Sequence, residues 1–177
     1  MGTAGDVMEA PAAEEQLEHV PHKKLVIIAW SGDLDKVWPQ MILATTGAAM
    51  GMETTVFFTF WGLFSLVKDD KRITGDNWMQ KMVAMMDRPG MEHLKLGKMN
   101  FAGAGPAMMK HLAKGHEVAS PGELLEMAVD LGVKLVPCQM TMDLLGLKRE
   151  DMIDGLGEPV GATTMLMEAQ DAITLFI

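Results

Sequence analysis

Two continuous apolar segments near the start of the chain predict buried strands. Residues 23–30 (KKLVIIAW) and 54–60 (TTVFFTF) lack the apolar–polar alternation of a half-exposed strand, and the second is rich in β-branched and aromatic side chains. Between them, apolar residues recur at helical spacing from Asp35 to Gly51, with Ser31 or Asp33 as the cap. A strand, a helix and a strand within about 37 residues predict a βαβ unit.

The remainder of the chain continues this alternation. A capping box marks one helix, because Ser120 stands at the N-cap position, Glu123 follows three residues later and Gly132 comes after the last turn. The pattern predicts helices over 76–86, 106–114, 121–131, 139–145 and 162–169, strands over 133–137 and 172–177, and a long loop over 91–105. Strands that alternate with helices favour a parallel sheet covered on both faces.

A membrane-spanning segment is the alternative interpretation of the first apolar region. Between Lys36 and Lys68 the only charged residue is Glu53, and the 31 intervening residues are long enough to cross a bilayer. A carboxylate near the centre of a span costs about 2.5 kcal/mol or more, however, and the period changes there from helix-like to strand-like. We therefore expect the βαβ unit and no stable membrane insertion.

The first 22 residues form a separate acidic segment. They contain five of the 24 Asp and Glu residues and no Lys or Arg. They show neither the cationic nor the apolar region of a signal peptide, so we expect a flexible tail over 1–22, a folded domain over 23–177 and a cytoplasmic protein. Without the tail, 19 acidic residues stand against 15 basic ones, a formal charge of −4, compared with −9 for the whole chain. This excess of acid argues against a nucleic-acid partner.

Methionine is unusually frequent, with 19 Met against 6 Phe and no Tyr. Flexible thioethers fill irregular gaps in cores and interfaces, and soft sulfur ligands also suit Cu(I). Packing is favoured, because no Met-rich run has His or Cys interleaved. With a mean hydropathy of +0.13, the composition indicates more apolar surface than one domain hides. It predicts a homo-oligomer, with the loop over 91–105 as the candidate contact.

Cys138 is the only cysteine, so the chain cannot form an intramolecular disulfide or a CxxC pair. It lies between the strand predicted over 133–137 and the helix predicted over 139–145, at the sheet edge where α/β proteins form crevices. Backbone N–H groups at the start of a helix favour a thiolate. A buried structural cysteine is the alternative, because a lone cysteine often serves only for packing.

No metal or cofactor site is predicted. His111 and His116 are five residues apart, which does not place two ligands on one helical face. The glycines at 103 and 105 do not follow a clear strand, so a nucleotide site is not expected. Asp33 and Asp35 follow the first strand, at the same edge as Cys138, and helix capping is the default interpretation of both.

Four stretches resemble the DsrE/DsrF-like family, in particular its DrsE-type, peroxiredoxin-like branch. They are residues 31–36 (SGDLDK), 57–62 (FFTFWG), 98–100 (KMN) and 132–140 (GVKLVPCQM), and the resemblance covers about residues 23–177. It implies a homo-oligomer and a three-layer α/β/α fold with a mostly parallel sheet of about five strands. It also implies that Cys138 carries a persulfide, at a site that we expect to be lined by Ser31, Asp33, Trp61, Met99, Asn100 and Gln139.

The favoured hypothesis is a sulfur carrier or sulfurtransferase. Cys138 would attack a sulfane-sulfur donor and pass the outer sulfur to an acceptor thiol. Because the chain has no second cysteine, that thiol must belong to a partner. One alternative is a non-catalytic ligand-binding or interaction module in which Cys138 is structural. Another is a thiol peroxidase that depends on an external reductant.

Overall fold

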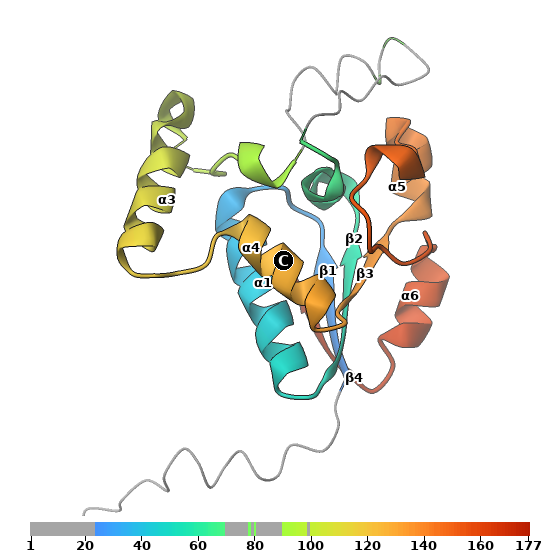
Figure 1. Cartoon of the computed structure of the whole chain (residues 1–177). Helices are drawn as coiled ribbons and strands as arrows, with labels where there is room; N and C mark the ends of the chain where they lie inside the picture. The colour runs from blue at the N-terminus through green and yellow to red at the C-terminus, as the bar shows by residue number, and fades with distance from the viewer. Residues whose placement is uncertain (1–23, 70–77, 79, 81–89, 99) are drawn as a thin grey trace, which may run out of the picture.

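The computed structural model describes residues 24–69, 78, 80, 90–98 and 100–177. The predicted acidic tail over 1–22 lies outside the described residues, as do most of the helix predicted over 76–86 and the predicted site residue Met99. Figure 1 shows a central sheet with helices on either side and with α3 (Ala104–Gly115) standing apart from it.

The sheet is parallel throughout its described strands. It contains β1 (Lys24–Ala29), β2 (Glu53–Phe58), β3 (Lys134–Pro137) and β4 (Ala172–Phe176), in the order β3-β2-β1-β4. The helix α1 (Leu34–Ala49) connects β1 to β2, so the predicted βαβ unit is confirmed. Neighbouring parallel strands need such a crossover connection. The chain makes one to each neighbour of β1, to β2 on one side and to β4 on the other.

The described residues form four strands, one fewer than the sheet of about five expected from the sequence. The position beside β3 where a further strand would pair is taken by residues 157–160. This segment exchanges only a few hydrogen bonds with β3, from Gly157 N–H to Leu135 O (2.9 Å) and from Val160 N–H to Pro137 O (3.1 Å). Its contact with the sheet is reduced to one bridge, between Val160 and Cys138. The glycine and proline in this segment favour irregular backbone over a strand.

Helices cover both faces of the sheet, which confirms the three-layer α/β/α architecture. In Figure 1, α1 and α4 (Pro121–Asp130) lie on one side, and α5 (Gln139–Leu145) and α6 (Ala162–Glu168) on the other. Alternate strand residues enter two buried clusters, as the period of a strand requires. The larger cluster, on the α1 and α4 side, includes Leu25, Ile27, Val56, Phe58 and Leu135. The smaller cluster, on the α6 side, consists of Val26, Phe57, Cys138 and Met165.

Local signals in the sequence account for most element ends. The predicted capping box is present, because Glu123 N–H donates to Ser120 Oγ and Ser120 N–H donates to the Glu123 carboxylate. Gly146 ends α5 with a φ of 69°, in the left-handed region that glycine adopts without strain. The predicted loop over 91–105 contains short 3₁₀ turns, η3 (Met91–His93) and η4 (Phe101–Gly103), and a further turn, η5 (Arg149–Asp151), follows α5.

The region weighed as a membrane span is divided between α1, β2 and a 3₁₀ helix, η2 (Phe60–Leu66). Among the described residues, none of the helices is both long and apolar enough to cross a membrane. Glu53, the charge in the middle of this region, begins β2 and accepts a hydrogen bond from Lys134 on β3. That hydrogen bond holds the pKa of Glu53 below its ordinary value.

The start of η2 packs against the end of β1, backbone to backbone. Gly62 N–H donates to Trp30 O (3.1 Å), and a Cβ at Gly62 would lie 2.8 Å from the Ala29 carbonyl carbon. Only a residue without a Cβ permits this approach. We expect Gly62→Ala to lower the free energy of unfolding by about 1–3 kcal/mol, because backbone rather than a movable side chain forms the obstacle.

Gly115→Ala is the matched control for Gly62→Ala. Gly115 ends α3, and a Cβ there would meet nothing within 4 Å. We expect this variant to keep its stability or to gain up to about 1 kcal/mol, through the reduced freedom of its unfolded chain. Urea unfolding of both variants measures the difference, and equal midpoints would contradict the close contact at Gly62.

Candidate functional site

The carboxyl ends of three adjacent strands meet at one edge of the sheet. Ser31 and Asp33 follow β1, Trp61 follows β2, and Cys138 and Gln139 follow β3. In open α/β sheets, ligands and reactive groups gather at this edge. The topology therefore brings five of the residues predicted for the site to the same end of the molecule.

Cys138 occupies the junction between β3 and α5. Its N–H donates to Phe58 O of β2 (2.9 Å), and its carbonyl accepts a hydrogen bond from Met142 N–H (3.0 Å). Cys138 is the N-cap residue of α5, with extended backbone angles. The position predicted from the sequence is thus the observed one. These two backbone hydrogen bonds fix the direction in which the Cys138 side chain leaves the backbone.

The Cys138 side chain points away from the open edge, into the smaller core cluster. It is 3% exposed and is buried with Val26, Phe57 and Met165, while Val160 packs against the same cluster. Strand alternation explains this direction, because Cys138 follows Pro137, which belongs to the opposite face. In this conformation the thiol is closed to solvent.

A pair of threonines, Thr141 buried and Thr59 half-buried, joins the end of β2 to α5. Thr59 Oγ1 and Thr141 Oγ1 share a hydrogen bond of 3.1 Å, and Phe60 N–H donates to Thr141 Oγ1 (3.2 Å). Phe60 has a φ of 46°, which is uncommon for a bulky residue and is strained. The pair therefore holds a strained turn beside Cys138. The pair was not predicted from the sequence, and the one available signal was a threonine in the first turn of the helix that follows Cys138.

Ser31, Asp33 and Lys36 form a separate polar group after β1. Ser31 Oγ donates to Asp33 Oδ2 (3.1 Å), and the Lys36 amine pairs with the same carboxylate. The hydrogen bond to Asp33 holds the pKa of Lys36 above its ordinary value. Asp33 stands at the N-cap of α1, yet its side chain makes no capping hydrogen bond. The expectation that this carboxylate caps the helix was wrong, because Lys36 and Ser31 engage it instead.

The other predicted site residues have different surroundings. Trp61 is 45% exposed and stacks on Phe64, with ring centroids 5.8 Å apart. The side-chain amide of Gln139 donates to the Asp143 carboxylate (2.8 Å). Asn100 has a buried Oδ1 with no hydrogen-bond partner among the described residues.

Within the described residues, Cys138 is next to Gln139 in the chain, but its side chain makes no hydrogen bond to the Ser31–Asp33 group. The two groups follow β3 and β1. Because β2 lies between these two strands, the strands are about 10 Å apart. The edge thus carries two neighbouring polar regions, one at Thr59–Thr141 and one at Ser31–Asp33. Cys138 borders the first of them.

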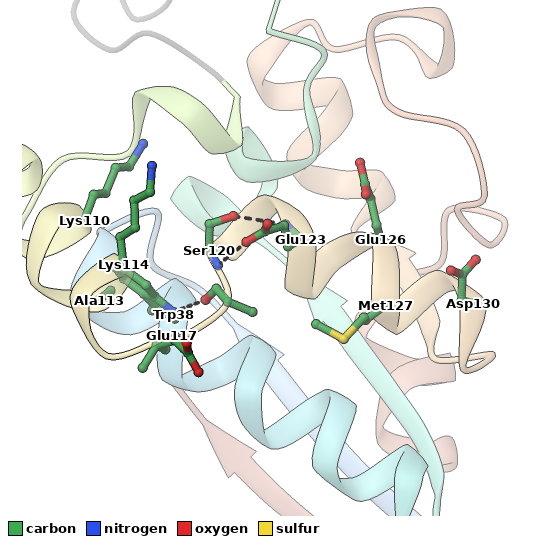
Figure 2. Close-up of a pocket in the computed structure, with 12 residues that line it drawn as sticks. Trp38, Lys110, Ala113, Lys114, Glu117, Ser120, Glu123, Glu126, Met127 and Asp130 are labelled. Carbon is green, nitrogen blue, oxygen red and sulfur yellow. Dashed lines mark hydrogen bonds between the residues drawn. The ribbon is translucent and has the colours of Figure 1, made fainter.

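A groove of about 790 Å³ lies elsewhere, on the α1 and α4 side of the sheet. Figure 2 shows it between α3, which contributes Lys110 and Lys114, and α4, which contributes Glu126 and Asp130. The Trp38 indole N–H donates to Ala119 O (2.9 Å) at its floor. Cys138 does not line this groove. No cluster of three or more His, Cys, Asp or Glu side chains able to hold a metal ion occurs in the part of the chain that the structure describes.

The fold and the edge cysteine together define a three-layer α/β protein with one thiol at the end of a central strand. The chain belongs to the DsrE/DsrF/DrsH-like family, whose model matches residues 21–176. The resemblance noted in the sequence is therefore confirmed.

Two relatives match nearly their whole length. The chain is 40% identical over 156 residues to YrkE of Bacillus subtilis, an uncharacterized protein, with 88% of this chain and 97% of the relative covered. It is 36% identical over 165 residues to the sulfur carrier protein DsrE2 of Allochromatium vinosum, with 88% and 98% covered. The crystal structure of the Escherichia coli protein ychN has a TM-score of 0.52 at 14% identity, over 88% of this chain and 99% of that one, which supports the fold.

Replacing Thr141 with valine tests the threonine pair. Valine keeps the shape of the side chain but leaves the Phe60 N–H and the Thr59 hydroxyl without this partner. We expect Thr141→Val to lower the free energy of unfolding by about 1–3 kcal/mol. Thr164→Val, at an exposed position of α6, is the control and should stay within about 0.5 kcal/mol of the parent protein. Thermal unfolding followed by circular dichroism measures both, and equal shifts would contradict a structural role for the pair.

Proposed function

We propose that this protein carries sulfane sulfur as a persulfide on Cys138 and passes it to the thiol of an acceptor protein. The observation that carries the proposal is the position of the chain's single thiol, at the carboxyl end of β3, in a protein 36% identical to a sulfur carrier protein. A parallel sheet favours this edge for reactive groups. Cys138 is the nucleophile, and the protein acts as a sulfurtransferase in a relay.

The transfer consists of two thiolate displacements without net oxidation. In the first, the Cys138 thiolate attacks the outer sulfur of a donor persulfide, a new S–S bond forms, and the donor leaves as its own thiolate. In the second, an acceptor thiolate attacks the outer sulfur on Cys138. The bond between the two sulfur atoms then breaks, and the Cys138 thiolate is regenerated. Donor and acceptor are separate molecules, because the chain offers no other cysteine.

Burial of Cys138 fits a carrier that protects its cargo. The neighbours Val26, Phe57 and Met165 are apolar, so water and small thiols are kept from the sulfur between the two transfers. Loading and unloading require this cover to move. Met165 is a flexible side chain on α6, a helix of seven residues that makes few long-range contacts. A partner that displaces α6 or residues 157–160 would open the site.

The surroundings of the edge suggest where partners bind. Exposed Trp61 and Gln139 lie at the carboxyl ends of β2 and β3, and the Ser31–Asp33 group borders them beyond Trp61. We assign Ser31, Asp33, Trp61, Asn100 and Gln139 to the docking region for donor and acceptor proteins, with Met99 as its predicted neighbour. We place the protein in the cytoplasm, as a homo-oligomer that uses neither nucleic acid nor a bound cofactor.

The second candidate is a non-catalytic interaction module with a structural cysteine. The exposed fraction of only 3% at Cys138, together with its packing against Val26, Phe57 and Met165, favours this alternative. The two functions differ in one measurable property. A structural cysteine accepts no sulfur while the protein remains folded.

Loading with a sulfur donor tests the proposal. Purified protein is incubated with a polysulfide or a thiosulfate-type donor and weighed intact by mass spectrometry. We expect one reducible sulfur on the parent protein and none on Cys138→Ser, which should keep the native circular dichroism spectrum. Trp61→Ala is a further variant that should load from the small donor at the parent level and slow only transfer to a protein thiol.

Three results would overturn the relay. They are loading of Cys138→Ser to the level of the parent, failure of the folded parent protein to load with any donor, and turnover of peroxide in place of sulfur transfer. Alkylation of Cys138 in urea serves as the control that the thiol is chemically intact. Loading in urea but never in the folded protein would favour the structural cysteine.

A further inference from the structure

The two edges of the sheet differ in the described structure. The edge formed by β3 is covered by residues 157–160, which bond to it at Leu135 and Pro137. The outer edge of β4 has no such cover among the described residues. Exposed strand edges offer unpaired backbone groups to any other strand, and proteins that stay monomeric blunt them with charge, proline or a bulge.

β4 has none of these protections. Its sequence, AITLF, contains no charge, no proline and no glycine. Ile173 is 46% exposed on one face and Phe176 is 68% exposed on the other. Parallel strands are normally buried on both faces, so such exposure is unusual for a strand of this type. Among the described residues, no strand pairs with the outer side of β4.

The outward backbone groups of β4 can be identified from its inner hydrogen bonds. Ile177 donates its N–H to Ile28 O (3.0 Å) and accepts from Trp30 N–H (2.9 Å), so both of its backbone groups face β1. Groups on a parallel strand alternate in direction from one residue to the next. Ala172, Thr174 and Phe176 therefore direct their carbonyl groups, and Thr174 and Phe176 their N–H groups, to the open edge.

We propose that β4 pairs antiparallel with β4 of a second copy of this chain, across a two-fold axis that passes beside Thr174. The two four-stranded sheets then form one continuous sheet. This interface is independent of the sulfur chemistry proposed for Cys138. It is also distinct from the loop over 91–105, the contact predicted from the sequence.

The side chains of β4 complement one another in this register. Thr174 lies opposite Thr174 of the second copy, and threonine pairs are favourable across strands. Phe176 lies opposite Ala172, the smallest side chain of the strand, so the ring has room. On the other face, Ile173 lies opposite Leu175. A shift of the register by two residues in either direction would leave one of the three residues with outward-facing backbone groups unpaired. A shift by one residue would place outward-facing backbone groups of one strand opposite inward-facing groups of the other.

Exposed apolar side chains continue the surface around the strand. Trp30 stacks on Phe176, with ring centroids 6.2 Å apart, and is itself 39% exposed. Leu166 and Met167, on the helix that leads into β4, are both 66% exposed. With Ile173 and Phe176 these five side chains present on the order of 500 Å². A standard interface buries about 800 Å² of each partner, so the apolar part supplies over half of the required area.

Charge substitutions at Thr174 test the pairing. Thr174 is exposed, so Thr174→Lys and Thr174→Glu should both fold, while each places like charges face to face at the two-fold axis. By light scattering after gel filtration, we expect the parent protein to have the mass of an even number of chains. Each variant alone should have half that mass. Thr46→Lys makes the same change at an exposed position of α1 and should keep the parent mass.

An equal mixture of the two variants provides the sharper test. Lys and Glu would then face each other at the axis, so the mixture should regain the parent mass. A monomeric parent protein, variants that keep the parent mass, or a mixture that stays at half mass would each overturn the proposal. Circular dichroism confirms that both variants are folded, and failure of one leaves the other to decide.

Discussion

The parallel pairing of β1 with β2 is the contact on which the rest of the structure depends. Six consecutive residue pairs, from Lys24 with Glu53 to Ala29 with Phe58, set the centre of the sheet. Because the strands run in the same direction, α1 must cross between them and both faces must be covered. The same pairing brings the ends of β1 and β2 together, where Gly62 meets the backbone of Ala29 and Trp30. Both β3 and β4 then add to this pair, one on each side.

Most of the elements could be predicted from the sequence because they depend on local signals. The apolar runs of β1 and β2 are continuous, Ser120 and Glu123 mark the start of α4, and Gly146 marks the end of α5. The number of strands could not be predicted in this way. Whether residues 157–160 become a strand or a short bridge depends on how they meet β3, which is 20 residues earlier in the chain.

The candidate site was predicted in position but not in geometry. The place of Cys138 at the end of a strand follows from its neighbours in sequence, whereas its burial depends on Met165 and Phe57, which are distant in sequence. The same limit applies to Thr59 and Thr141, whose hydroxyl groups meet only because β2 and β3 are adjacent. For Asp33 the local rule itself was outweighed, because a nearby lysine competes with the helix for the carboxylate.

Burial of Cys138 also makes every reaction at its sulfur a gated one. At 3% exposure, a reagent reaches the thiol only while Met165 or Val160 is displaced. If Met165 and Val160 close over the thiol faster than the reagent attacks, the rate of alkylation rises in proportion to the reagent concentration. If attack is faster, the rate levels off at the frequency of opening. The concentration dependence of alkylation therefore reports how often this side of the sheet opens. The alkylation rate of one cysteine thus measures the motion of the helix above it.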